Sequence, residues 1–146
     1  MLLVQNFYTM ETATATNYAK THLSHLISLA FVDGKLTNNE RKQIYSIGLL
    51  KGLRFEEIDQ LFFNPEFRYD REMPKEEKFS QMYDLIHMSK SNDGYVDQQE
   101  IDLCNTIAVK LGIHKEKSHL LIKTIIQCIE NEVPKEKASM KVDSYL

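Results

Sequence analysis

Apolar residues recur at helical spacing along most of the chain. One set lies at i, i+3, i+4, i+7 and i+8 and predicts a helix that starts near Asn17: Leu23, Leu26, Ile27, Ala30 and Phe31. Similar stripes occupy residues 44–50, 58–62, 79–87, 104–111 and 120–128. No segment shows the sustained alternation of apolar and polar residues that is typical of a strand. We therefore expect an all-α domain, a bundle of six or seven helices.

Prolines mark several boundaries between these helices. Pro74 and Pro134 are each followed by lysine and glutamate, as expected for proline at the first helical position with an acidic first turn. The pair Asn64-Pro65 interrupts the helix before it. Proline therefore separates the early helices from the later ones.

These signals predict one domain over residues 17–142, after a poorly ordered N-terminal tail of residues 1–16. Within the domain we expect a first helical unit over about 17–63, a linker over 64–73 and a second helical unit over about 74–131.

Aromatic residues surround the linker. Phe63 precedes its Asn-Pro pair, and Phe67 and Tyr69 follow. We expect the linker to fold back and to pack its aromatic side chains over the core. The alternative is that Phe63, Phe67 and Tyr69 form an exposed patch on which a protein partner docks.

A motif of eight residues occurs twice, at an offset of 60 positions (33 to 93). Segment 33–40 reads Asp-Gly-Lys-Leu-Thr-Asn-Asn-Glu, and segment 93–100 reads Asp-Gly-Tyr-Val-Asp-Gln-Gln-Glu. At the same offset, Gly52 aligns with Gly112. Matches that keep one offset over about 30 residues indicate a duplicated helical unit.

One interpretation of the motif needs no ligand. Its glycine supplies the left-handed residue that follows a helix. Thr37 with Glu40, and Asp97 with Glu100, then form capping boxes that begin the next helix. The aspartate that opens each motif accepts a backbone hydrogen bond in an Asx turn. The motif is then a helix–corner–helix, and we name the two copies the first and second corner.

The second interpretation is a site for a divalent cation, Ca²⁺, Mg²⁺ or Zn²⁺. Placing the opening aspartate at position 5 of an EF-hand loop puts the closing glutamate at position 12. In the first corner, positions 1 and 3 are Leu29 and Phe31, which cannot bind calcium, whereas in the second they are Ser89 and Ser91. The second corner is therefore the better candidate, unless the two corners meet in one site. The candidate ligands are Asp33, Glu40, Asp93, Asp97 and Glu100.

Composition excludes several classes of partner. The 146 residues carry a formal net charge of −3 with both signs spread along the chain, so the basic stripe that nucleic acids require is missing. The apolar run Met1-Leu2-Leu3-Val4 is too short for a signal peptide or a membrane span, so no membrane insertion is expected. Cys104 and Cys128 lie at apolar helical positions without metal spacing, which favours a reducing, cytoplasmic setting.

The two corners and the all-helical plan resemble the TerB-like family, which is named for a tellurite-resistance protein. The matching segments run from Ala30 to Glu40 and from Asn92 to Glu100, and the second continues to Leu111-Gly112-Ile113. Residues 83–88 and 100–104 resemble an uncharacterised TerB-like group common in Bacteroidota. The similarity spans about residues 17–130.

The resemblance implies an all-helical domain with two repeats related by a pseudo-two-fold axis and no enzymatic activity. It implies a divalent-cation or partner-binding surface at Asp33, Glu40, Asp93 and Glu100. It also implies a role in a stress response, peripheral to membrane-associated complexes. Lys90 departs from the family pattern and is placed in sequence to neutralise Asp93.

Catalytic signatures are missing from the sequence. His22 and His25 lie three residues apart, but neither Glu-x-x-His nor His-Glu-x-x-His occurs, so we expect ordinary surface or packing histidines. The five glycines are isolated and form no phosphate loop. The main hypothesis is a non-catalytic binding module that acts through protein partners in a cytoplasmic stress response. The alternative is a divalent-cation sensor that uses the acidic corners.

Overall fold

The computed structural model describes the backbone of residues 2–146 and the side chains of residues 13–146. The described chain forms seven α-helices and a final 3₁₀ turn, so the prediction of an all-α bundle is confirmed. The elements are α1 (Leu2–Ala30), α2 (Asn38–Leu50), α3 (Phe55–Phe63), α4 (Lys75–Asp93), α5 (Gln98–Lys110), α6 (Lys115–Glu130), α7 (Lys135–Val142) and η1 (Asp143–Tyr145).

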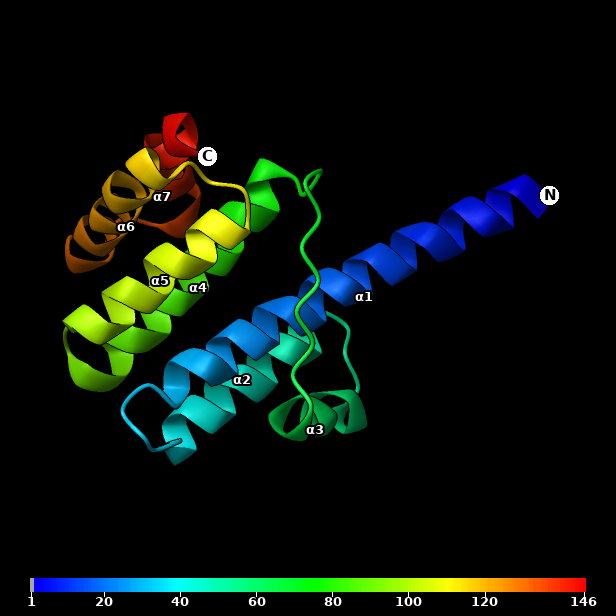
Figure 1. The fold of residues 1–146 in the computed structure, drawn as a ribbon, viewed down its shortest axis with the longest axis horizontal. Coiled ribbons are helices and arrows are strands. Elements are labelled where there is room, and N and C mark those ends of the chain that lie inside the picture. Colours follow the sequence, from blue (N-terminus) through cyan, green and yellow to red (C-terminus); the bar gives the residue numbers. More distant parts are fainter. Residues whose placement is uncertain (1) are drawn as a thin grey trace.

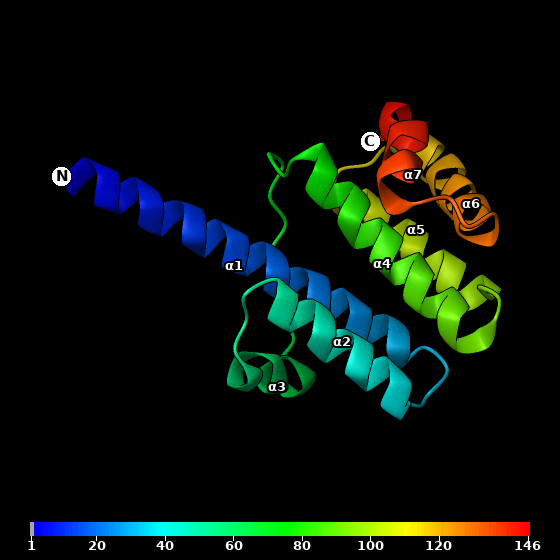
Figure 2. The same ribbon diagram turned by 180° about the vertical axis from the view of Figure 1, so that it is seen from behind.

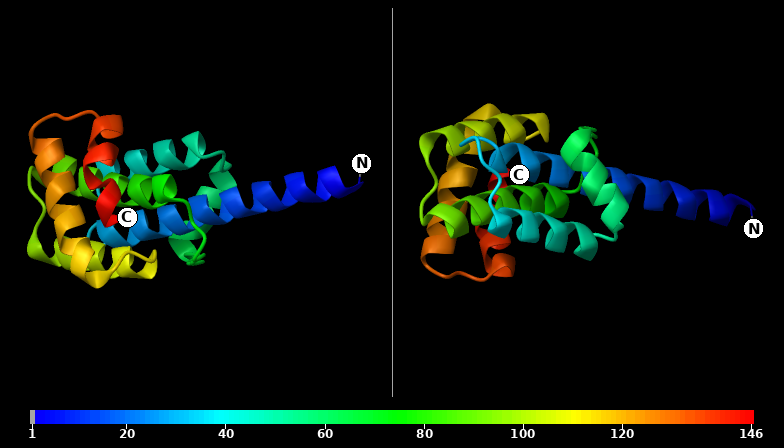
Figure 3. Two further views of the ribbon diagram at one scale, coloured as in Figure 1. Left: turned by 90° about the horizontal axis from the view of Figure 1, so that it is seen from above. Right: turned by 90° about the horizontal axis from the view of Figure 1, so that it is seen from below.

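The first helix begins earlier than the apolar pattern predicts. α1 runs from Leu2, so the expected start near Asn17 is wrong and the backbone of residues 2–16 is helical; Met1 lies outside the described residues. The N-terminal part of α1 extends away from the other helices in all views (Figures 1, 2 and 3). The apolar stripe that predicted this helix covers only the part of α1 that packs on the bundle. Among the residues whose side chains are described, Ala19 lies in the core and Tyr18 packs against it.

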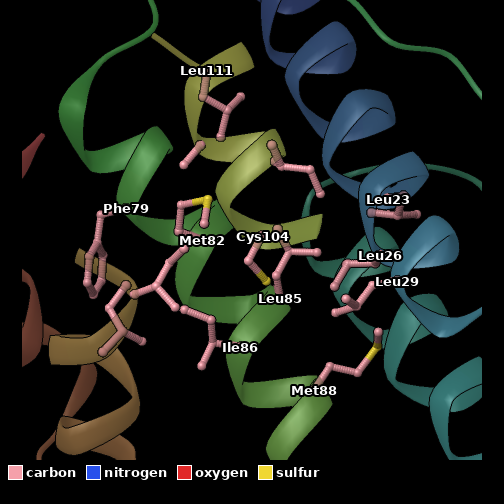
Figure 4. Close-up of a cluster of buried hydrophobic side chains, with 14 of the residues drawn as sticks. Leu23, Leu26, Leu29, Phe79, Met82, Leu85, Ile86, Met88, Cys104 and Leu111 are labelled. Atoms are coloured by element: carbon pink, nitrogen blue, oxygen red, sulfur yellow. The ribbon is translucent and has the colours of Figure 1, made fainter. Parts of the chain in front are cut away.

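Helix α4 lies at the centre of the bundle. It contacts α1 and α2 on one side and α5, α6 and α7 on the other (Figure 1). Leu23, Leu26 and Leu29 of α1 lie close to Leu85 and Met88 of α4 in the core (Figure 4). Burying one such side chain fully contributes about 1.5–3 kcal/mol, so this apolar contact stabilises the packing of α1 on α4.

The two corners share a left-handed glycine at the offset of 60 residues, although α1 ends at Ala30 and α4 continues to Asp93. Gly34 and Gly94 have φ of 87° and 77°, in the left-handed region that other residues rarely adopt. Further along, the Leu53 N–H donates to the Gly48 carbonyl at 3.0 Å, and the Ile113 N–H donates to the Ala108 carbonyl at 3.0 Å. The positive-φ glycine and this backbone hydrogen bond therefore occur at matching positions in both segments.

Smaller expectations need correction at helix ends. Pro74 and Pro134 occupy the N-cap rather than the first helical position, since α4 and α7 begin one residue later. Three members of the predicted apolar stripes, Phe31, Leu50 and Leu120, are exposed. Phe31 lies just beyond the end of α1 and Leu50 is the last residue of α2, where the chain turns away from the core.

Candidate functional site

Each of the two corners contains one capping box. Thr37 Oγ1 accepts the Glu40 N–H at 3.1 Å, and Glu40 Oε1 accepts the Thr37 N–H at 3.1 Å. In the second corner, Asp97 Oδ1 accepts the Glu100 N–H at 2.9 Å, and Glu100 Oε1 accepts the Asp97 N–H at 3.2 Å. The predicted capping boxes are thus confirmed in both corners.

Both closing glutamates are buried, and the second has a further partner. Glu100 Oε2 accepts a hydrogen bond from the hydroxyl of buried Ser89. Burial raises the pKa of Glu100, while the hydrogen bonds from Ser89 and the Asp97 backbone oppose that rise. Ser89, which the EF-hand alignment placed at a ligand position, is therefore buried and engaged with protein.

The opening aspartates differ between the corners. Asp33 is exposed and its Oδ1 accepts the Lys35 N–H at 3.3 Å, which confirms the predicted Asx turn. Asp93 is the last residue of α4. The expectation that Lys90 neutralises Asp93 is wrong, because the Lys90 ammonium lies 3.4 Å from Glu130 Oε1 at the end of α6.

The first corner contacts the end of α4, just before the second corner, through neutral side chains. Asn39 at the start of α2 donates to Asn92 Oδ1 at 2.8 Å, near the end of α4. Asn92 donates to Gln43 Oε1 at 2.9 Å, and Gln43 donates to Ser91 Oγ at 3.0 Å. Within residues 13–146 no three His, Cys, Asp or Glu side chains gather in a way that could hold a metal ion. The amides, rather than the predicted carboxylates, form the junction.

The linker between α3 and α4 folds back along α1, as its aromatic residues predicted (Figure 1). Thr21 Oγ1 accepts the Arg68 N–H at 2.9 Å and donates to the Arg68 carbonyl at 3.2 Å. Ser24 Oγ accepts the Glu66 N–H at 2.9 Å. Side chains of α1 thus satisfy backbone groups of an extended segment, which explains why Thr21 and Ser24 are buried polar residues.

The linker aromatics gather around His25 rather than in the core. Phe67 and Tyr69 are 44% and 40% exposed, and their ring centroids lie 5.4 and 5.7 Å from that of His25. The Tyr69 hydroxyl is 2.8 Å from His25 Nε2. Phe63 is 82% exposed and belongs to the end of α3. Two of the three predicted partner-binding residues are therefore neighbours, and the third is separate from their cluster.

Two buried histidines are the polar feature that the sequence interpretation underestimated. His22 Nε2 lies 2.9 Å from Asp84 Oδ2, and Lys135 Nζ lies 3.3 Å from Asp84 Oδ1. Burial lowers the pKa of His22, and lowers that of His25 to about 3, so both imidazoles are neutral at physiological pH. For Asp84, burial acts to raise the pKa, but the hydrogen bond and charge of His22, with Lys135, produce a net lowering.

The sequence contains an indication that His22 and His25 are buried. No charged residue occurs from Thr21 to Val32, so this part of α1 has no strongly polar face. A helical segment of this kind is expected to be covered on all sides. The polar residues within it must then be hydrogen-bonded inside the protein.

An aromatic cluster on α2 and α3 is partly exposed: Phe55 is exposed, whereas Tyr45 and Phe62 are half-buried and pack against the core. The Tyr45 ring centroid lies 5.9 Å from that of Phe55 and 5.8 Å from that of Phe62, and the Arg41 guanidinium lies 5.2 Å from the Phe62 centroid. Leu49 follows Tyr45 by one helical turn and is 43% exposed. We name Arg41, Tyr45, Leu49, Phe55 and Phe62 the α2–α3 surface.

No helix among the described residues is long and apolar enough to cross a membrane. The chain matches no family model, no curated protein and no solved structure. The resemblance to the TerB-like family accordingly stays a prediction that rests on the two corners.

Proposed function

We propose that this chain is a non-catalytic module that works by binding a protein partner through its α2–α3 surface. The observation that supports this function is the partly exposed aromatic cluster on that surface, with Phe55 and Leu49 as its exposed members. Phe55 is 58% exposed although its ring lies tilted against that of Tyr45, and Arg41 lies over the neighbouring ring of Phe62. Aromatic and arginine side chains dominate the binding energy of protein interfaces, and contiguous exposed apolar patches mark such interfaces.

The position of the surface also favours an interface. It lies at the edge of the core, where Tyr45 and Phe62 are half-buried while Leu49 and Phe55 remain exposed. Tyr45 donates a hydrogen bond to Asp59 of α3, which holds the two helices in a fixed relation. A preformed surface loses little conformational entropy on binding.

The wider role that we propose is a cytoplasmic stress response, supported by the resemblance of the corners to the TerB-like family. The free and buried thiols of Cys104 and Cys128 suit a reducing compartment. The divalent-cation sensor remains an alternative prediction. Its ligands would have to include Glu40 and Glu100, whose carboxylates already cap helices.

Site-specific photocrosslinking in cells of the source organism tests the proposal. A photoreactive amino acid replaces Leu49 on the surface or, as the matched control, Lys137, which is exposed on α7. We expect one discrete adduct from the Leu49 position and none from the control. The partner identified by mass spectrometry is then purified, and its affinity for the intact chain is measured by calorimetry.

Two variants of the α2–α3 surface test whether it is the binding site. Phe55→Ala and Arg41→Ala change exposed side chains, so the fold is retained, as circular dichroism will verify. Each is expected to weaken the partner's binding at least tenfold, about 1.4 kcal/mol. Unchanged affinity in both variants, or equal crosslinking from the control position, would show that the surface is not the binding site.

A further inference from the structure

A second surface lies on the other half of the molecule, between α5 and α6. Two adjoining hollows of about 450 and 200 Å³ run between these helices and share Asn105 and His119 in their walls. Together they form one groove, which we name the α5–α6 groove. It is built from the second repeat, whereas the α2–α3 surface belongs to the first.

The floor of the groove is apolar and follows both helices. Ile101 and Val109 line it from α5, and Ile122 and Ile126 line it from α6. Ile101 and Val109 are eight residues apart, which corresponds to about 12 Å along a helix, or about two turns. The length and the apolar lining match what two turns of a docked amphipathic helix present with anchors at i, i+3 or i+4, and i+7.

The one polar side chain in the middle of the floor is already satisfied. Asn105 Oδ1 accepts a hydrogen bond from Ser118 at 2.8 Å, and Asn105 Nδ2 donates to the Ile101 carbonyl at 3.2 Å. An occupant does not have to supply a polar group there. An apolar helix face therefore suits the floor better than a polar ligand.

The rim of the groove is positively charged. Lys110, Lys115 and Lys123 line it, and none forms an ion pair with another described residue. α6 begins at Lys115 without a side-chain cap, so its N-terminal N–H groups add partial positive charge. The only carboxylate in the lining, Asp102, accepts a hydrogen bond from Gln98 at 2.8 Å. A basic rim on a chain of net charge −3 indicates an acidic occupant.

We propose that the α5–α6 groove binds an acidic amphipathic helix of a protein partner. The apolar face of that helix packs on Ile101, Ile122 and Ile126, while its carboxylates meet the three rim lysines. Phosphate-rich partners fit less well, because a nucleic acid would leave the apolar floor uncovered. This binding site is separate from the α2–α3 surface and does not depend on it.

Fluorescence anisotropy with the full chain tests this proposal. The probe is a fluorescein-labelled peptide of about 18 residues with leucine at i, i+3, i+4 and i+7 and glutamate at most other positions. A matched peptide carries lysine in place of every glutamate. We expect saturable binding of the glutamate peptide that weakens as salt is raised from about 50 to 300 mM, and no binding of the lysine peptide.

Paired variants locate the site. Lys115→Glu with Lys123→Glu is expected to weaken binding of the glutamate peptide at least tenfold, and Val109→Asp to weaken it by a similar factor. The control has the same change of charge elsewhere, Lys35→Glu with Lys137→Glu, at two exposed positions, and is expected to bind as the unmodified chain does. Phe55→Ala should also bind normally, so failure here and failure at the α2–α3 surface are distinguishable.

Three results would overturn the proposal. One is absence of binding of the glutamate peptide to the unmodified chain. Another is equal binding by the Lys115→Glu, Lys123→Glu variant and the unmodified chain. The third is tighter binding of phosphatidylserine vesicles or of a single-stranded oligonucleotide, with displacement of the peptide, which would assign the basic rim to lipid or nucleic acid.

Discussion

The imidazole of His22 and the carboxylate of Asp84 join α1 to α4 through a contact of 2.9 Å. Because a carboxylate only accepts, the His22 nitrogen that faces it, Nε2, carries the proton. Lys135 of α7 approaches the other oxygen of Asp84 at 3.3 Å, so one carboxylate connects three helices. Nearby, His22 Nδ1, His25 Nδ1 and Gln81 Oε1 are buried without a protein partner. Buried polar groups therefore lie between α1 and α4.

The neutral state of these histidines predicts a pH-dependent stability. The pKa of His25 falls from 6.5 to about 3 on folding, so the unfolded chain binds protons below pH 6.5 that the folded chain does not. Its contribution is fully present above pH 6.5 and is lost as the pH falls. For His25 we expect the free energy of unfolding to decrease as the pH falls below 6.5, with a slope that approaches about 1.4 kcal/mol per pH unit near pH 5.

Urea unfolding at several pH values between 5 and 7.5 measures this slope. His25→Gln removes one buried titrating group and should reduce the slope by about 1.4 kcal/mol per pH unit. Ser46→Ala changes an exposed side chain that does not titrate and should leave the slope unchanged. If the two variants behave alike, His25 is not held neutral in the folded chain.

The linker offers a second prediction. Thr21→Ala removes the hydroxyl that binds both the N–H and the carbonyl of Arg68. We expect a loss of about 1–2 kcal/mol in the free energy of unfolding and faster amide hydrogen exchange at Glu66 and Arg68. Thr106→Ala, which removes an exposed threonine hydroxyl on α5, serves as the control. Unchanged exchange in the linker would mean that the Thr21 hydroxyl is not what holds it.

Close packing of α2 gives a third prediction. A Cβ atom added to Gly48 would lie 2.7 Å from side-chain carbons of both Ile58 and Leu23, which are fully buried. Gly48→Ala is expected to destabilise the chain by about 1–3 kcal/mol even though alanine favours helices. Ser46→Ala, on the exposed side of the same helix, should be neutral or slightly stabilising. Thermal unfolding of both variants checks the contrast.

The fourth prediction concerns the corners as a cation site. Because Glu40 and Glu100 cap helices and the corner carboxylates do not gather, we expect Ca²⁺, Mg²⁺ and Zn²⁺ to leave the amide signals of residues 89–100 unchanged in NMR titrations. Shifts that saturate, and that disappear in Asp93→Asn, would instead support the cation sensor.

Much of the local structure was predictable, because it depends on residues close in sequence. Thr37 with Glu40, and Asp97 with Glu100, interact within one helical turn, so their spacing alone reveals the capping boxes. The Asx turn of Asp33 is local for the same reason. The start of α1 was not predictable from apolar spacing, because its first part projects from the bundle.

The polar contacts between distant segments could not be predicted from spacing. His22 and Asp84 are separated by 62 residues, and Asn39 and Asn92 by 53. Their pairing depends on how α1, α2 and α4 pack, which no single-sequence pattern encodes. The same limit explains why Lys90 was assigned to nearby Asp93 when its partner is Glu130, 40 residues away.

The contacts between the linker and α1 limit where the chain can be cut or extended by an insertion. Insertions and protease cuts are usually tolerated in the segment that joins two repeats, since such segments are solvated. Here that segment shares hydrogen bonds with Thr21 and Ser24, and its Tyr69 is 2.8 Å from His25. Cutting the chain at residues 66–70 would therefore remove hydrogen-bonding partners of α1, and the two predicted helical units are not separable within the linker.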